Sequence, residues 1–514
     1  MRMRWSGYCV HARRLLHTFG FGRRLAGVKW IGYFASLAIS TFALPALAQN
    51  TEPVPSYTVD AAQGPVTGST RVIGLGGAYV AVAEDMDGIA VNPASVAVRL
   101  PYSWSRFDFG FGFDFAISGY LPETNFLNRG PRDEQEQQQT EPEVEQRSLL
   151  FGSVGFTVYY EQAGFGVSAE GQQQALQRAE DSSAGLAPSD LTGNFGIVHA
   201  SAGYGFFDGQ FVLGAGPRVT GVSLSRASSS SGLLSVAGIG YQVGAVYKPN
   251  RSGLRVGAAY KTEVRPSFER SAGGTPEQPV YNTTALRLPW QASAGFAYQF
   301  GARELNYELI TAEDRARPFR EQLEREADDR EHELEEAEST YEANPTPEND
   351  EHLARVKARV RTAEKRDEQR LEQHEEQVND ELLKAYLARP RFYFLVSSEL
   401  LVLGPTSDSI DLASVYQNRS KVRFSGETLT LSPRLGVESE VIPNWLKLRA
   451  GSYLEPARVS GASDRLHGTG GFDVKLFRWN VFGLVGDFDS WLLSAAVDSA
   501  REYLSTSFSI GFWH

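Results

Sequence analysis

Phenylalanine occupies every second position from Phe107 to Phe115, and this alternation constrains the fold more than any other feature of the chain. The intervening positions hold only aspartate and glycine. Because successive side chains of a strand point to opposite faces, the segment predicts a strand with one aromatic face and one small or charged face. In a membrane β-barrel, lipid covers the first face and the second lines the lumen, so the pattern favours a transmembrane barrel.

The same alternation recurs later in the chain. One face of each segment carries an apolar set: Leu286, Leu288, Trp290, Ala292, Ala294, Phe296 and Tyr298; then Leu429, Leu431, Leu435 and Val437; then Leu504, Phe508, Ile510 and Phe512. A β-sandwich also alternates and is the alternative fold. The length of these strands and their aromatic faces favour the barrel.

Strand-like segments number about 14, an even count as single-chain bacterial barrels have. The predicted ranges are 103–121, 148–161, 163–176, 194–206, 210–226, 235–248, 253–267, 285–300, 391–403, 427–440, 445–456, 466–478, 490–500 and 502–513. The predicted fold class is therefore all-β, an antiparallel transmembrane β-barrel with an N-terminal hatch and an inserted, charged α-helical hairpin.

The connections between these strands alternate in length. Those at 161–163, 207–209, 249–252 and 442–444 are short, whereas those at 122–147, 177–193, 227–234, 268–284, 404–426 and 457–465 are long and polar. Barrels place short turns in the periplasm and long loops outside. The first strand is therefore expected to rise from the periplasm.

The insert at 302–389 is dense in charged residues and poor in aromatic ones. Its sparse apolar residues follow helical spacing, and Asn344-Pro345-Thr346-Pro347 interrupts them, which predicts two long helices folded as a hairpin. The strand order places this hairpin in the periplasm. A further short strand at 303–309 would make 15 strands and move it outside. The insert is either a solvated spacer or a module that docks a periplasmic protein.

The first 48 residues have the pattern of a secretory signal peptide. A basic lead precedes an apolar run over 30–47, which ends in Ala46-Leu47-Ala48. This order predicts cleavage after Ala48 and ordinary Sec export, with a membrane anchor as the alternative. Cys9 lies inside the signal, so the mature chain would contain no thiol. The expected division is 1–48 signal, 49–102 hatch, 103–301 barrel, 302–389 hairpin and 390–514 barrel.

Several functional classes lack support in the sequence. The net charge of −12 offers no basic surface for nucleic acid. His332, His352 and His374 lie in the charged insert without the spacing of a zinc protease, and we interpret them as solvated. His199 and His467 lie in predicted strands. The chain has no G-x-S-x-G motif, and Asp487 and Asp489 lie near a predicted turn. We expect no enzyme activity, no metal site and no cofactor.

The most specific motif precedes the first predicted strand. It runs from Arg71 to Asp85 as R-V-I-G-L-G-G-A-Y-V-A-V-A-E-D and is followed by Asn92-Pro93-Ala94. A dinucleotide site is a poor match, because the strand–helix unit and the later acidic residue are missing. The motif resembles the hatch of the outer-membrane transporter family for long-chain fatty acids and other hydrophobic compounds (FadL-like). The charged hairpin departs from that family's pattern.

The resemblance implies a barrel of about 14 strands whose N-terminal segment fills the lumen. It also implies capture of a hydrophobic molecule outside and passage through the barrel, with exit through the wall as one route. The hatch residues that match are Gly74, Gly76, Gly77, Glu84, Asp85, Asn92, Pro93 and Ala94. The glycines would allow close packing, although a plain structural turn explains them equally well. Asn92 would fix the turn before Pro93.

The sequence therefore predicts an outer-membrane passive transporter for hydrophobic small molecules. The expected partners are such a molecule, outer-membrane lipid, the barrel assembly machinery and a periplasmic protein held by 302–389. The assembly machinery would recognise the last strand, which ends in Phe512-Trp513-His514. A docking barrel in secretion or envelope organisation is the alternative function. A general porin is a third, which the hatch argues against.

Overall fold

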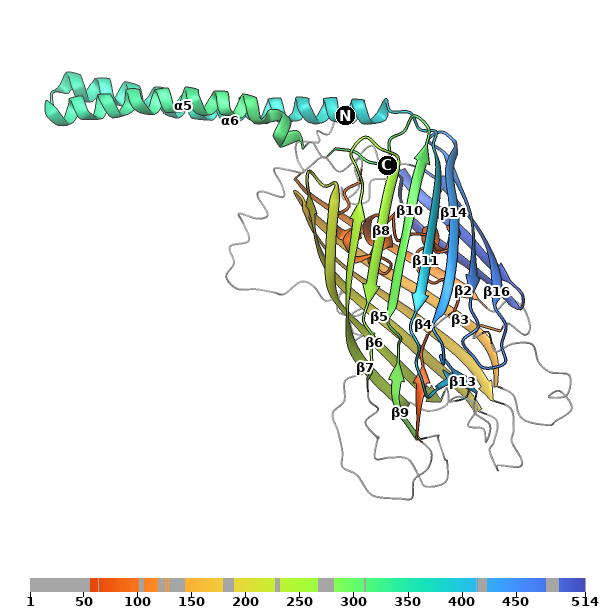
Figure 1. The fold of residues 1–514 in the computed structure, drawn as a ribbon. Coiled ribbons are helices and arrows are strands. Elements are labelled where there is room, and N and C mark those ends of the chain that lie inside the picture. The colour runs from red at the N-terminus through yellow and green to blue at the C-terminus, as the bar shows by residue number, and fades with distance from the viewer. Residues whose placement is uncertain are drawn as a thin grey trace, which may run out of the picture. The chain divides into compact units, whose positions relative to one another are not determined.

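The chain forms a closed β-barrel in a computed structural model (Figure 1). The structure describes residues 56–62, 64–100, 106–118, 125–126, 128, 144–178, 189–226, 232–266, 282–308, 311–412, 414, 423–477 and 490–513. The predicted signal peptide with its cleavage site, Cys9, Asp487, Asp489 and His514 lie outside these residues. The chain divides into two compact units, one with the helical hairpin and one with the barrel.

The barrel has 14 strands, and neighbouring strands are antiparallel throughout. They are β2 (Phe107–Ser118), β3 (Val144–Tyr160), β4 (Ala163–Arg178), β5 (Ser189–Phe206), β6 (Phe211–Arg226), β7 (Gly232–Tyr247), β8 (Leu254–Lys261), β10 (Gln291–Phe300), β11 (Phe394–Leu403), β14 (Thr430–Ile442), β15 (Leu446–Glu455), β16 (Arg465–Lys475), β17 (Ser490–Ala500) and β18 (Tyr503–Trp513). Each predicted strand overlaps one of these, and β18 pairs with β2 to close the barrel. The predicted fold class is confirmed.

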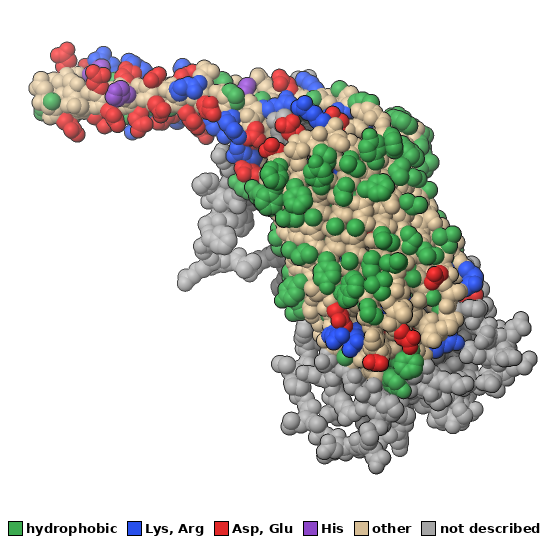
Figure 2. Space-filling view, in the orientation of Figure 1, with side chains coloured by type: hydrophobic (Ala, Val, Ile, Leu, Met, Phe, Trp, Pro, Cys, Tyr) green, Lys and Arg blue, Asp and Glu red, His purple; other side chains and the backbone are tan. Residues whose placement is uncertain are grey.

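The outer wall of the barrel is apolar. Phe107, Phe109, Phe111 and Phe113 are 45–59% exposed, whereas Asp114 on the opposite face is 4% exposed. Figure 2 shows apolar side chains spread over the barrel wall. Such a closed barrel satisfies every strand hydrogen bond inside a bilayer, and the chain is a multi-pass outer-membrane protein. Among the described residues, no helix is both long and apolar enough to span a membrane.

The predicted strand 285–300 is wrong as a single element. Its first part is β9 (Asn282–Arg287), which leaves the barrel and pairs in parallel with β1 (Ser56–Asp60). Two short strands, β12 (Ser409–Asp411) and β13 (Phe424–Ser425), complete this small sheet. Pro289 follows β9 and has no N–H to continue a ladder. Leu286 and Leu288 are therefore buried against Val59 and Ile410 and do not face lipid.

The short connections share one end of the barrel with the helical insert. The chain turns there between β3 and β4, β5 and β6, β7 and β8, and β14 and β15. β10 ends at Phe300 opposite Phe394 of β11, so the insert leaves and rejoins the barrel at this same end. Residues 301–308 contain no strand, which rules out the arrangement with 15 strands.

The insert is a helical hairpin, as predicted. α5 (Ala312–Ala343) begins at a capping box formed by Thr311 and Asp314, and α6 (Pro347–Leu387) begins with a proline behind Thr346. Salt bridges join the helices, including Arg320–Glu375 at 2.8 Å and Arg370–Glu326 at 3.0 Å. The predicted helical spacing from residue 302 is wrong at its start, because Leu305 lies outside α5 and packs in the barrel core.

Candidate functional site

The segment 64–100, called the hatch segment below, lies inside the barrel lumen. It contains the short helices α3 (Thr70–Gly74) and α4 (Asp85–Ile89) and the 3₁₀ helix η1 (Pro93–Ala97). α3 contacts β15–β18 and β2, α4 contacts β2–β5, and η1 contacts β3–β7. Because these contacts run around most of the wall, the segment is enclosed by the strands (Figure 1).

An ionic network holds the hatch segment to the wall. Arg71 of α3 donates to both carboxylate oxygens of Glu438 on β14, each at 2.9 Å. Its Nη1 atom also donates to Glu84 at 2.7 Å and to the Tyr79 hydroxyl at 3.2 Å. Arg449 of β15 contacts the same Glu438 at 2.5 Å. We call Arg71, Glu84, Glu438 and Arg449, together with Arg255, the hatch network.

Glu84 is the hatch carboxylate that bridges two arginines. It accepts from Arg71 at 2.7 Å and from Arg255 of β8 at 2.8 Å. Burial alone would raise the pKa of Glu84, but the guanidinium groups of Arg255 and Arg71 lower that pKa to about 2. The residues on either side, Ala83 and Asp85, have φ of 38° and 50°, a left-handed conformation that costs non-glycine residues energy. The ion pairs thus hold a strained turn.

The adjacent Asp85 faces a different strand. Its Oδ1 accepts from Thr157 at 2.5 Å and from the Tyr159 hydroxyl at 3.2 Å, both on β3. Burial raises the pKa of Asp85, and the two hydroxyl donors act in the opposite direction. The acidic dipeptide singled out in the sequence therefore ties the hatch segment to two separate regions of the barrel.

Asn92 connects three pieces of backbone. Its side-chain oxygen accepts from Ala94 N at 3.0 Å, which caps η1 behind Pro93. Its amide donates to Val80 O at 2.8 Å and to Ala245 O of β7 at 3.2 Å. Gly244 lets the hatch segment approach this closely, since a Cβ there would lie 2.0 Å from Asn92 Oδ1. Asn92 and Ala94 are fully buried, and Pro93 between them is buried as well.

The three hatch glycines differ in how strictly the backbone conformation requires glycine at each position. Gly76 and Gly77 have φ of +61° and +74°, in the left-handed region, whereas Gly74 ends α3 with ordinary dihedrals. A Cβ on Gly76 would lie 2.8 Å from the Ser452 backbone nitrogen. A Cβ on Gly74 would meet only ordinary contacts, at 3.4 Å or more. The structure therefore requires glycine at two of the three positions.

Sequence reasoning missed the wall residues that bind the hatch segment. Glu399 of β11 accepts from Tyr79 N at 3.0 Å and from Val80 N at 2.8 Å. Asp114 of β2 accepts from Thr70 N at 2.8 Å. The available signal was a charged residue on the lumen face of a predicted strand, which is costly to bury without a partner.

The base of the hairpin is bonded to the hatch network. We call residues 301–308 and 390–393 the hairpin root. Arg255, which holds Glu84, also donates to Asn306 Oδ1 at 2.8 Å and to Leu305 O at 3.0 Å. Tyr393 donates to Glu438 at 2.7 Å, and Arg303 binds Glu440 at 3.1 Å. The same charged residues thus contact the hatch segment and the root.

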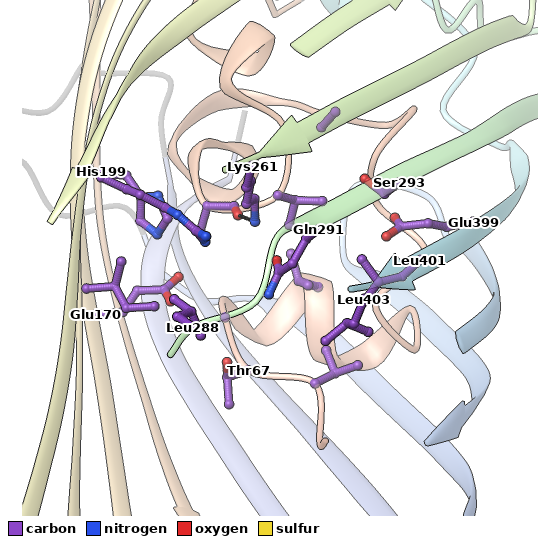
Figure 3. A pocket seen from close by; sticks show the side chains of 18 of the residues that line it. Thr67, Glu170, His199, Lys261, Leu288, Gln291, Ser293, Glu399, Leu401 and Leu403 are labelled. Atoms are coloured by element: carbon purple, nitrogen blue, oxygen red, sulfur yellow. Dashed lines mark hydrogen bonds between the residues drawn. The ribbon is translucent and has the colours of Figure 1, made fainter. Parts of the chain in front are cut away.

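A cavity of about 140 Å³ lies between the hatch segment and the wall. Figure 3 shows Glu170 and His199 on one side, Leu401 and Leu403 on the other, and Lys261 and Gln291 between them. Other lining residues are apolar, including Val66, Val72, Phe195, Ile197, Ala259 and Leu288, and two are arginines, Arg218 and Arg434. The cavity lining therefore mixes apolar and charged side chains.

The histidines of the strands face the interior. His199 is 2% exposed and His467 is fully buried, where it contacts Asp498 at 2.8 Å and Glu455 at 2.7 Å. His332 on α5 is 88% exposed. Within the described residues, no three His, Cys, Asp or Glu side chains converge as a metal site requires.

Comparison with known proteins gives similarity of structure only. No protein-family model matches the chain. No curated protein sequence matches it either. Among solved structures, a Pseudomonas aeruginosa FadL homologue is similar with 12% identity and a TM-score of 0.44, over 88% of this chain and 99% of that one.

Two further similar structures are hydrocarbon channels by their descriptions. The Pseudomonas putida toluene transporter TodX has 10% identity and a TM-score of 0.42, over 88% of this chain and 99% of that one. The CymD monoaromatic hydrocarbon channel has 12% identity and a TM-score of 0.42, over 88% and 97%.

Proposed function

We propose that this chain is a passive outer-membrane transporter for hydrophobic small molecules, in which the hatch segment closes the lumen and the cavity receives the substrate. The observation that carries this proposal is the cavity of about 140 Å³ between hatch and wall, whose lining includes many apolar side chains. An apolar molecule gains free energy by leaving water for such a pocket. An open water-filled pore offers it no such gain.

The presence of the hatch segment favours stepwise transport of the substrate rather than its free diffusion through an open pore. The contacts of this segment with the wall combine the polar bonds of Glu399, Asp114 and the hatch network with apolar packing against residues such as Leu395. The polar bonds can exchange partners with water when the hatch segment shifts, which lowers the cost of local opening. The gating role of Gly76, Gly77, Glu84, Asp85 and Asn92 forms part of this proposal.

Uptake into proteoliposomes tests the proposal with a matched pair of variants. Ser293 lines the cavity, and Ala294 is the next residue of β10 and is exposed on the outer wall. Ser293→Trp should fill the cavity and reduce toluene uptake at least about tenfold, since a few kcal/mol of pocket binding is lost. Ala294→Trp should leave uptake unchanged. Equal uptake by both variants, or rapid flux of sucrose through the unmodified protein, would contradict the proposal.

A docking barrel is the second candidate, because the hairpin root shares Arg255 and Glu438 with the hatch network. A partner bound to the hairpin would act on residues that also hold the hatch segment. Replacing 312–387 by a short linker spares the root and tests this function. Loss of a co-purifying protein with toluene uptake intact favours docking. If the same protein still co-purifies after the replacement, the docking function is excluded and the hairpin acts as a spacer.

A further inference from the structure

The cavity is lined in part by a buried arginine with unused hydrogen-bonding capacity. Arg218 of β6 is 2% exposed, and its Nη2 atom donates to Thr262 O at 2.6 Å. Its Nε atom has no hydrogen-bond partner, and within the described part of the chain Arg218 forms no ion pair. A buried guanidinium without a counter-charge costs several kcal/mol, so a site that retains one is suited to an anionic group.

A second cation lies in the same cavity. Lys261 of β8 donates to Ala90 O of the hatch segment, and no carboxylate of the described residues lies within salt-bridge distance of it. Glu399 and Arg434, which also line the cavity, pair with each other at 3.5 Å. Glu170 is therefore the wall carboxylate that remains to balance the two cations.

The hatch segment does not supply the missing negative charge. Asp87 of α4 lines the cavity, but burial, together with the nearby Asp114, raises the pKa of Asp87 to about 8. At neutral pH it is mostly uncharged. Arg218 and Lys261 therefore outnumber Glu170 among the charged cavity residues outside the Glu399–Arg434 pair.

The neighbouring histidine adds a hydrogen-bond acceptor. His199 lies directly opposite Arg218 in the β5–β6 ladder. Gln242 donates through Nε2 to Ser201 at 2.9 Å, so its Oε1 accepts from His199 Nδ1 at 3.0 Å. A neutral imidazole that donates through Nδ1 presents Nε2 as an acceptor. Arg218 is therefore the partner for acidic oxygens, whereas the His199 acceptor suits a hydroxyl or another donor group of the same ligand.

The size of the cavity limits the rest of the ligand. An enclosed apolar cavity of ~150 Å³ accepts one benzene ring, and this partly open cavity has a comparable volume of about 140 Å³. The side opposite His199 carries Leu401 and Leu403, with Glu399 beside them (Figure 3). An extended long-chain acid exceeds this volume several-fold, whereas a single ring with one small polar group fits.

We propose that the cavity binds a ring-sized organic acid as its anion, with the acidic group held by Arg218 and Lys261 and the ring against Leu401 and Leu403. This inference rests on the proposed function and narrows its substrate class. The polar contacts select for charge, and the apolar side selects for a compact ring. Neutral hydrocarbons would enter the cavity without the contribution of Arg218.

Calorimetric titration of the protein in lipid nanodiscs tests the proposal, with benzoate and its neutral analogue benzyl alcohol as probes. Arg218→Met keeps an unbranched apolar stem and removes the guanidinium with its charge. We expect the benzoate Kd to rise at least about tenfold, because a charge-assisted hydrogen bond is lost, while the benzyl alcohol Kd changes less than about twofold. Arg251→Met in an exposed turn is the matched control and should change neither value.

Three outcomes would overturn the inference: equal affinity for both probes, tighter binding of hexadecanoate than of benzoate, or an unchanged benzoate Kd in the Arg218 variant. Should Arg218→Met fail to fold, as its heat-dependent gel mobility would reveal, Lys261→Met provides the same comparison. The uptake of toluene by the Ser293→Trp and Ala294→Trp pair reports on the proposed function separately. Toluene transport without benzoate selectivity would refute only the inference.

Discussion

Arg71 of the hatch segment and Glu438 of strand β14 form a two-point ion pair, with both nitrogen–oxygen distances at 2.9 Å. The two residues lie 367 positions apart in the sequence. Glu438 is 2% exposed and also contacts Arg449 and Tyr393. One carboxylate therefore joins the hatch segment, the barrel wall and the hairpin root.

Removing this carboxylate should loosen the hatch segment. Glu438→Gln would leave Arg71 and Arg449 without their shared counter-charge in a buried site, at a cost of about 3 kcal/mol or more. We expect faster hydrogen–deuterium exchange over residues 70–92 and ion conductance in planar bilayers. Glu427→Gln, at an exposed position, is the control. Unchanged exchange and conductance in Glu438→Gln would show that the pair does not hold the hatch segment.

The stability of the hatch segment should fall at acidic pH. Glu84 has its pKa lowered to about 2, so its ion pairs with Arg255 and Arg71 contribute fully above the unfolded pKa near 4.5. Their contribution, on the order of 3 kcal/mol, is lost as the pH falls from 4.5 toward 2. Exchange over 80–90 should accelerate across this window, and Glu84→Gln should remove the acceleration. The same pH profile in both proteins would refute this role of Glu84.

Ionisation of Asp87 should lower the stability of the folded protein as the pH rises. Its pKa, raised to about 8 by burial, exceeds the ordinary aspartate value of 3.8. The folded state therefore holds a proton that the unfolded state has lost, and stability declines as the pH rises from about 4 to about 8. Asp87→Asn mimics the protonated form and should flatten this decline in thermal unfolding experiments. A variant whose melting temperature declines as steeply as that of the unmodified protein would contradict the assignment.

The hatch glycines offer a matched comparison. Gly76→Ala places a Cβ 2.8 Å from the Ser452 backbone and requires a left-handed alanine, so we expect a loss of about 2 kcal/mol or more. Gly74→Ala meets only ordinary contacts and should be neutral or slightly stabilising. Thermal unfolding in detergent measures both. Equal melting temperatures of the two variants would show that the left-handed φ of Gly76 does not affect stability.

Asn92 should be sensitive even to an isosteric change. Asn92→Asp retains the acceptor that caps η1 but replaces the amide donor to Val80 O and Ala245 O with a carboxylate oxygen. Two lost hydrogen bonds and a buried charge beside carbonyl oxygens should cost about 3 kcal/mol. Asn250→Asp, in the β7–β8 turn, is the control. A melting temperature unchanged by Asn92→Asp would mean that this side chain does not join hatch and wall.

The barrel was predictable because its signal is local and repeated. Phe107 to Phe115 alternate with aspartate and glycine, and lipid is the only partner such a surface needs. The hairpin was predictable for a similar reason, since charge density and a proline-rich break are visible in one segment. The burial of Leu286 and Leu288 in the small sheet was not predictable. Their apolar pattern suits a lipid-facing strand equally well.

The candidate site was predictable only on the hatch side. Asn92, Gly76 and Glu84 lie in one recognisable motif, but their partners are single residues on distant strands. Nothing local links Arg71 to Glu438, or Glu84 to Arg255. The cavity is built by side chains from the hatch segment and several strands, so it exists only once the barrel has closed.

Mass spectrometry of the intact protein, extracted from its own outer membrane in mild detergent, tests the central claim most directly. A transporter for hydrophobic molecules should retain a small organic ligand in a one-to-one ratio, and Ser293→Trp should lose it while Ala294→Trp keeps it. A protein that carries no such ligand but holds a stoichiometric protein partner, lost when 312–387 is removed, would contradict the transport account and favour docking.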